Sequence, residues 1–193
     1  MKAAVFHGPQ RPLEIAEVPA PRPARGEVLV RVAGCGLCHT DLHYIDHGVK
    51  TFKPPPLILG HEAAGVVAEL GPGVTGRAVG DRVLIPSVLG CGQCDYCRQG
   101  RENLCSQMVM LGNNIDGGYA ELVVVTAKDL LLVPKELPLE RACVIADALS
   151  TPFHAVRRRA KVRLGESVVV VGCGGVGLNV VQGALACRDD GRD

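Results

Sequence analysis

The sequence has almost no net charge and no long apolar run, and each absence excludes a class of partner. Its 193 residues contain 21 Lys and Arg against 20 Asp and Glu, which gives +1 at pH 7. Nothing in this balance attracts nucleic acid or an anionic membrane surface. The longest apolar stretches are strand-sized, as at Val168–Val171, whereas a membrane-spanning helix needs about 20 apolar residues. We expect neither a nucleic-acid partner nor a membrane span.

The N-terminal residues also lack the apolar core and cleavage site of a secretory signal, so we expect a cytoplasmic protein. Internal repeats and low-complexity segments are absent as well. Cysteine, in contrast, is abundant, with nine in the chain. Without a signal peptide, and with C-x2-C clustering, these cysteines are expected to be reduced and in part metal-bound.

The clearest motif is a run of cysteines in the pattern C-x2-C-x2-C-x7-C, formed by Cys91, Cys94, Cys97 and Cys105. Thiolates three residues apart can converge on one ion, and the fourth returns after a short excursion. This spacing predicts one tetrahedral zinc ion held by a tight loop.

A second group of residues that can bind a metal ion lies upstream of the four cysteines. Cys38 and His61 offer a soft thiolate and an imidazole, both common zinc ligands. Asp41 is a candidate to fix the tautomer of His61. Cys35 precedes Cys38 in a further C-x2-C pair, and spacing alone does not choose between these two cysteines.

Thr40 and His43 lie three residues apart and share a face if this segment is helical. A hydroxyl beside a metal, linked to a histidine that reaches solvent, forms a path for a proton. We therefore treat this pair as a candidate proton relay.

A glycine-rich turn follows the apolar segment Ser167–Val171, which we predict to be a strand of a parallel sheet. The turn matches G-x-G-x-x-G from Gly172 through Gly174 and Gly175–Val176 to Gly177, and helical character follows over Leu178–Ala186. In this context the glycines permit a tight turn and close approach of a pyrophosphate to the helix N-terminus.

The chain upstream of residue 138 reads as short strands separated by glycine and proline, which predicts an antiparallel barrel. Beyond Pro138 the pattern changes to two helices, Leu139–Ala146 and Ser150–Ala160, before the glycine turn. The expected strands are Ala3–His7, Leu13–Val18, Glu27–Ala33, Gly65–Leu70, Arg82–Pro86, Tyr119–Thr126 and Leu130–Val133.

Together these motifs resemble the N-terminal part of the zinc-containing medium-chain alcohol dehydrogenases, from Met1 to about Ala186. The resemblance is carried by Cys38–Asp41, Gly60–Glu62, the four-cysteine loop, Asp116–Glu121 and Gly172–Gly177. It implies a GroES-like antiparallel β-barrel over residues 1–147, with a structural zinc lobe at about 90–106. Residues 148–193 would begin a Rossmann domain with its first strand–helix unit.

The resemblance also implies roles for individual residues. Cys38 and His61 resemble catalytic zinc ligands, and Glu62 resembles a carboxylate that approaches the metal transiently. Thr40 and His43 resemble the relay from substrate to solvent, His39 a residue facing the cofactor phosphates, and Thr151 one near the nicotinamide. The four cysteines of the loop match the structural zinc site. The implied cofactors are two Zn²⁺ ions per chain and NAD or NADP.

One position departs from the family pattern. The third catalytic ligand is commonly a cysteine, and the matching position here is Asp147. Aspartate binds zinc through oxygen, so we expect Asp147 to be the third ligand. Cys143, one helical turn earlier, is the alternative.

The expected activity is oxidation of a primary or secondary alcohol to an aldehyde or ketone, with hydride transfer to NAD(P). A small alcohol or carbonyl substrate and a homodimer or homotetramer of the full-length form are implied. Only 16 residues follow Gly177, and Asp189 and Asp190 follow no predicted strand, so the cofactor domain is expected to be incomplete. The alternative is a truncated, non-catalytic zinc-binding barrel fragment that binds no cofactor. A zinc-free quinone reductase relative is disfavoured by the intact ligand set.

Overall fold

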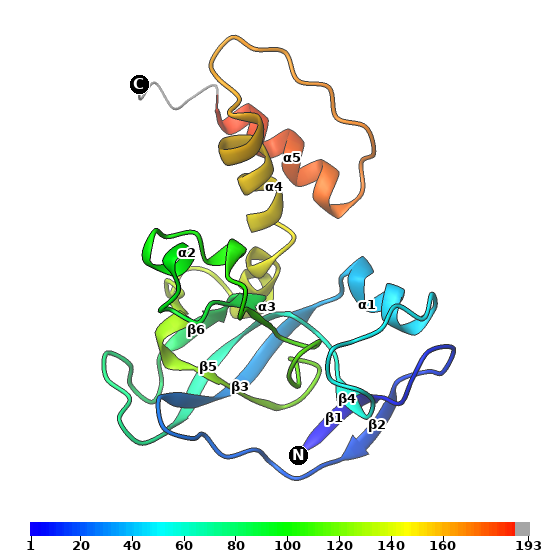
Figure 1. Cartoon of the computed structure of the whole chain (residues 1–193), viewed down its shortest axis with the longest axis vertical. Coiled ribbons are helices and arrows are strands. Elements are labelled where there is room, and N and C mark those ends of the chain that lie inside the picture. The colour runs from blue at the N-terminus through cyan, green and yellow to red at the C-terminus, as the bar shows by residue number, and fades with distance from the viewer. Residues whose placement is uncertain (188–193) are drawn as a thin grey trace. The chain divides into compact units, whose positions relative to one another are not determined.

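A computed structural model describes residues 1–187 and shows a mixed fold of antiparallel sheets and short helices, which confirms the predicted fold class (Figure 1). Asp189 and Asp190 lie outside the described residues. The chain divides into two compact units, Met1–Ala146 and a second that starts at Asp147.

The first unit contains three antiparallel sheets, ordered β2-β1-β4, β10-β6-β5-β3-β9 and β7-β8. Their strands are β1 (Lys2–Phe6), β2 (Glu14–Glu17), β3 (Glu27–Gly36), β4 (Leu57–Ile58), β5 (Glu62–Leu70), β6 (Arg82–Ile85), β7 (Val88–Leu89), β8 (Val109–Met110), β9 (Leu122–Thr126) and β10 (Leu131–Leu132). The helices of this unit are α1 (His39–Ile45), α2 (Asp95–Arg98), η1 (Glu102–Leu104), η2 (Ala127–Asp129), α3 (Leu139–Ala142) and η3 (Cys143–Ala146).

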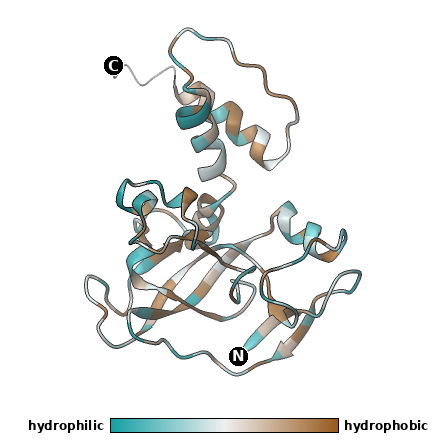
Figure 2. Cartoon of the chain, viewed as in Figure 1, coloured by the Kyte–Doolittle hydropathy of each residue, from teal (hydrophilic) through white to brown (hydrophobic). Residues whose placement is uncertain are grey.

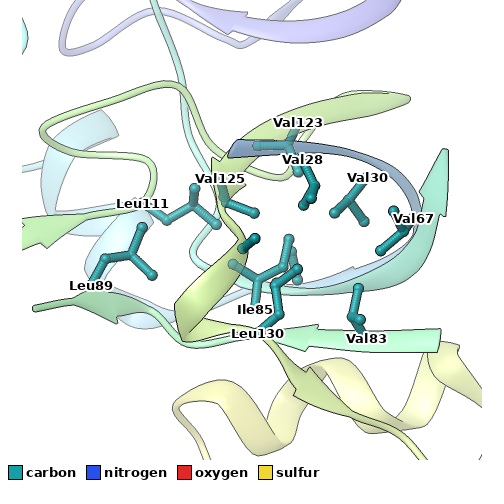
Figure 3. Packing of buried hydrophobic residues seen from close by; sticks show 12 residues of the cluster. Val28, Val30, Val67, Val83, Ile85, Leu89, Leu111, Val123, Val125 and Leu130 are labelled. Carbon is teal, nitrogen blue, oxygen red and sulfur yellow. The ribbon is translucent and has the colours of Figure 1, made fainter. Parts of the chain in front are cut away.

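The five-stranded sheet organises the core because alternate residues of its strands point to opposite faces. On β6, Val83 and Ile85 pack into the larger cluster, whereas Leu84 between them packs against α3 and η3. Figure 3 shows the larger cluster enclosed by curved strands. Its labelled members are Val28, Val30, Val67, Val83, Ile85, Leu89, Leu111, Val123, Val125 and Leu130.

All seven predicted strands of this unit are present, with ends that differ by a few residues. Strand β3 continues three residues further than predicted, to Gly36, and β5 starts three residues earlier, at Glu62. The two strands pair from Val28 opposite Leu70 to Gly36 opposite Glu62, with two register shifts between these ends. The two-residue strands β4, β7 and β8 were not predicted, because runs this short carry no readable alternation.

The second unit is helical over its described residues, with α4 (Ser150–His154), the π-helix η4 (Ala155–Ala160) and α5 (Gly175–Ala186). The predicted helix 150–160 is thus present but changes type midway. The predicted strand Ser167–Val171 is wrong, because this segment forms no ladder and leaves Val169 89% and Val171 97% exposed. A parallel strand needs a hydrogen-bonded neighbour, and the described residues of this unit contain no other strand.

Hydrophobic residues follow the strands of the first unit, and polar residues gather in its connecting loops (Figure 2). None of the helices in residues 1–187 combines the length and the apolar content that a membrane span requires.

Candidate metal centres

The four predicted cysteines of the loop converge in the structure. Their sulfur atoms all lie within 4.8 Å of one another, and Cys91 Sγ is 3.9 Å from Cys97 Sγ. Four sulfurs placed tetrahedrally at about 2.3 Å from zinc are about 3.8 Å apart. The lobe that carries them consists of α2 and η1 and lies between β7 and β8. The spacing of the sulfurs therefore fits a tetrahedral all-sulfur site.

Backbone N–H groups of the lobe point at these sulfurs. The N–H groups of Cys91 and Gln107 donate to Cys105 Sγ at 3.4 and 3.3 Å, and that of Cys94 donates to Cys91 Sγ at 3.4 Å. Donation from the Gln93 and Cys94 backbone lowers the pKa of the Cys91 thiol to about 6. Burial acts in the opposite direction on Cys97 and raises its pKa to about 12. The donors favour thiolate, which is the form that binds zinc.

A second group of donors brings together Cys38, His61, Glu62 and Asp147, with one ligand atom of each within 4.8 Å of the others. Cys38 directly precedes α1, and His61 and Glu62 stand where β5 begins. Asp147 is bonded to Ala146, which is buried in the first unit and accepts a hydrogen bond from Ser87 Oγ at 3.2 Å. The β3–β5 pairing thus supplies three of the donors, and the end of η3 supplies the fourth.

Glu62 enters this group because its neighbour across the ladder is a glycine. A Cβ at Gly36 would lie 2.1 Å from Glu62 Oε2 and 3.1 Å from Glu62 Cβ. Only a residue without a side chain leaves room for the buried carboxylate at this position. Sequence reasoning missed the role of Gly36, because it depends on strand register.

The carboxylate of Asp41 lies beside the His61 ring. Its Oδ1 lies 3.8 Å from His61 Nδ1, and both side chains are buried. Its Oδ2 accepts hydrogen bonds from the Cys38 backbone N–H at 3.2 Å and from the Tyr119 hydroxyl at 2.7 Å. Burial and the Asp41 charge raise the pKa of Tyr119, which keeps this phenol a donor. Tyr119 was not among the predicted site residues.

The two alternative cysteines lie elsewhere among the described residues. Cys35 is inside β3, and burial raises the pKa of its thiol to about 12. Cys143 packs against the sheet, its Sγ donates to the Glu140 carbonyl at 3.3 Å, and burial raises its pKa. Neither sulfur belongs to the donor group of Cys38 and His61.

Thr151 contacts the aspartate of this group. Its hydroxyl donates to Asp147 Oδ1, and its backbone N–H donates to the Asp147 carbonyl at 2.9 Å. Thr151 therefore orients the carboxylate, a contact that the sequence did not indicate.

The predicted helix that pairs Thr40 with His43 is present as α1. The Thr40 hydroxyl oxygen lies 3.6 Å from Cys38 Sγ, whereas His39 and His43 are exposed on the helix surface. The helix thus places Thr40 beside a residue of the donor group and His43 in solvent.

Two glycines of the turn in the second unit stand where a side chain would be strained or would clash. Gly172 has a φ of +94°, and a Cβ at Gly177 would lie 1.8 Å from the Gly172 carbonyl oxygen. At Gly174 and Gly175 a Cβ would meet nothing within 4 Å. The first and third glycines of the motif are therefore required by the turn itself, and the middle of the turn, at the N-terminus of α5, is open.

This chain resembles known alcohol dehydrogenases both in sequence and in fold. Residues 24–135 match the alcohol dehydrogenase GroES-like domain family. An alcohol dehydrogenase of Geobacillus stearothermophilus is 46% identical over 188 residues, which are 96% of this chain and 55% of that protein. A solved NAD-dependent alcohol dehydrogenase superimposes with a TM-score of 0.90 and 36% identity, over 97% of this chain and 55% of that one.

The cobalt- and zinc-bound thermostable alcohol dehydrogenase from Pyrobaculum aerophilum superimposes with a TM-score of 0.90 and 38% identity. The superposition includes 97% of this chain and 57% of that one. The chain thus spans little more than half the length of these relatives. The family match, the shared fold and the two donor groups together place the chain in the zinc-containing medium-chain alcohol dehydrogenase family.

Proposed function

We propose that this chain supplies the zinc-binding domain and the start of the cofactor domain of a zinc-dependent alcohol dehydrogenase. The reaction is oxidation of a primary or secondary alcohol to an aldehyde or ketone, with hydride transfer to NAD or NADP. The observation that carries the proposal is the convergence of Cys38, His61, Glu62 and Asp147 next to Thr40. A thiolate, an imidazole and a carboxylate form an ordinary zinc ligand set.

In this proposal Cys38, His61 and Asp147 hold the catalytic zinc, and Glu62 is the carboxylate that approaches it transiently. A bound zinc ion supplies a Lewis acid that lowers the pKa of an alcohol hydroxyl. In this proposal the Asp41 carboxylate, 3.8 Å from Nδ1 of His61, favours a proton on Nδ1 and leaves Nε2 as the donor nitrogen. Cys91, Cys94, Cys97 and Cys105 hold the second, structural zinc.

The proton of the alcohol leaves through the chain's own side chains. The Thr40 hydroxyl can accept it while passing on its own, because a hydroxyl is both donor and acceptor. His43, exposed on the same helix, then exchanges the proton with solvent.

The second unit binds the dinucleotide in this proposal. NAD(P) supplies the hydride acceptor. The open turn over Gly174, Gly175 and Val176 receives the pyrophosphate at the N-terminus of α5, framed by Gly172 and Gly177. His39 would be the residue that faces the cofactor phosphates, and Thr151 the residue near the nicotinamide. Residues 1–147 are the GroES-like domain and 148–193 the beginning of the Rossmann domain.

Metal analysis of purified protein tests the zinc assignment. We expect two zinc ions per chain in the wild type, one in Cys38→Ala and one in Cys97→Ser, with cobalt-substituted protein reporting which site is lost. A single ion bound only by the 91–105 segment would refute the proposal. Alcohol-dependent reduction of NAD(P), followed by absorbance with and without chelator, tests the reaction.

One observation favours a second function, that of a zinc-binding barrel fragment without cofactor binding. The segment Ser167–Val171 is unpaired and largely exposed, so the strand that precedes the glycine turn is not formed. Calorimetry with NADH separates the two functions. A micromolar dissociation constant supports the dehydrogenase, and absence of binding supports the fragment. A cytoplasmic location and a homo-oligomeric full-length form stay predictions.

A further inference from the structure

Three histidines stand one turn apart at α1 and the residues that follow it. His39, His43 and His47 are all exposed. The His39 and His43 ring centroids are 5.2 Å apart, and those of His43 and His47 are 5.1 Å apart. Nδ1 of His43 lies 3.0 Å from Nδ1 of His47. Two imidazole nitrogens thus face each other at the molecular surface.

This separation matches that of two ligands on one ion. Two nitrogens that bind at right angles, each about 2.1 Å from the ion, are about 3.0 Å apart. Imidazole pairs suit Ni²⁺, Cu²⁺ and Zn²⁺, and right-angle geometry is typical of Ni²⁺ and Cu²⁺. Without an ion, one ring donates its Nδ1–H to the other. Ion binding needs only that the donor ring move its proton to Nε2, so no net proton is released.

The backbone that carries the two rings is held from several sides. The Asp46 N–H donates to the Leu42 carbonyl at 2.7 Å, and the Val49 N–H donates to the His43 carbonyl at 3.1 Å. Next to His43 in α1, Tyr44 is buried in the core. The backbone on both sides of His47 is therefore held before an ion binds, which reduces the ordering cost of binding.

We propose that His43 and His47 form a third metal site, a surface site for a divalent transition-metal ion, distinct from both donor groups described above. Water fills its remaining coordination positions, because both histidines are exposed. An ion on Nδ1 of His43 would also stop this histidine from exchanging the relay proton with solvent, so the ion acts as an inhibitor. That consequence rests on the proposed function, whereas the binding does not.

Equilibrium dialysis of the zinc-loaded chain against Ni²⁺, with elemental analysis of nickel and zinc, tests the site without an activity assay. The variants are His47→Gln and, as matched control, His154→Gln, which alters an exposed histidine of the second unit. We expect one bound nickel in the wild type and in the control, with zinc retained. Loss of one of two linked ligands weakens binding about a hundredfold in His47→Gln.

Equal nickel binding by His47→Gln and the control would overturn the proposal. Nickel uptake matched by an equal release of zinc would overturn it too, because the ion would then occupy one of the other sites.

Discussion

The two donor groups are candidates for the same metal, yet they are built in opposite ways. The four-cysteine group comes from 15 consecutive residues, Cys91–Cys105, and its sulfurs are held by backbone N–H groups of the same lobe. The group at Cys38 takes its donors from the end of β3, the start of β5 and the end of η3. One group takes all its donors, four sulfurs, from a single short segment. The other depends on pairing between segments that are distant in the sequence.

This difference implies different sensitivities. The local site depends on its own ligands, whereas the assembled site also depends on residues that touch no metal, such as Gly36 and Tyr119. A variant that disturbs one group should therefore weaken zinc binding there and leave the other group loaded. Four variants, at Cys97, Asp147, Gly36 and Tyr119, test the comparison.

Cys97→Ser should have the largest effect. Structural zinc contributes about 10 to 16 kcal/mol of apparent binding free energy in small zinc domains, and serine does not replace a thiolate. We expect loss of the lobe zinc and rapid proteolysis between residues 91 and 105, with the Cys38 site still loaded. Elemental analysis and limited proteolysis measure both results. Loss of both ions at once would show that the two sites are not independent.

Asp147→Ala should empty the assembled site. It removes a ligand rather than a supporting partner, so the loss of affinity should exceed the tenfold to hundredfold effect of an outer contact. The lobe zinc should remain, as a competitive chelator titration would show. Asp147→Cys, which restores an ordinary zinc ligand, is the matched rescue. An alanine variant that still holds two zinc ions would rule out Asp147 as a ligand.

Gly36→Ala tests strand register without changing any ligand. The new Cβ would lie 2.1 Å from Glu62 Oε2, and overpacking of this kind typically costs about 1 to 3 kcal/mol. We expect a lower melting temperature and weaker zinc binding at the Cys38 site alone. Gly174→Ala is the control, because a Cβ there would meet nothing within 4 Å. Equal behaviour of the two variants would contradict the assigned role of Gly36.

Tyr119→Phe should have the smallest effect. It removes the hydroxyl that donates to Asp41 at 2.7 Å and to the Gly36 carbonyl at 3.1 Å, and it keeps the ring. Zinc affinity at the assembled site should fall about tenfold to hundredfold, with the lobe unaffected. Tyr96→Phe, which alters an exposed tyrosine of the lobe, is the matched control. Unchanged affinity in Tyr119→Phe would show that Asp41 needs no support from this phenol.

The same contrast explains what could be predicted from sequence. The four cysteines could be placed together because thiolates three residues apart have little freedom to do otherwise. The choice between Cys35 and Cys38 was open from spacing. It depends on where β3 ends: Cys35 lies within the strand and Cys38 follows it. Spacing does not show where a strand stops, so neither this choice nor the contacts of Gly36 and Tyr119 could be predicted.

The predicted strand Ser167–Val171 failed for a related reason. An apolar run of this length reads as a buried strand only on the assumption that neighbouring strands exist. The described residues of the second unit supply none, so the valines are exposed. The helix after the glycine turn needs no such partner, since its hydrogen bonds are internal, and α5 is present as predicted.

The pairing of Gly36 with Glu62 has a consequence for how the protein matures. The cysteine lobe can capture its ion on a nascent, otherwise unstructured polypeptide, because all its ligands emerge close together. The assembled site at Cys38 forms only after β3 and β5, which are separated by the 25 residues 37–61, have paired in the correct register. Metal loading should therefore be sequential during biosynthesis, with the cysteine lobe binding its ion first. Metal bound at the assembled site would then indicate that the sheet has formed with the correct register.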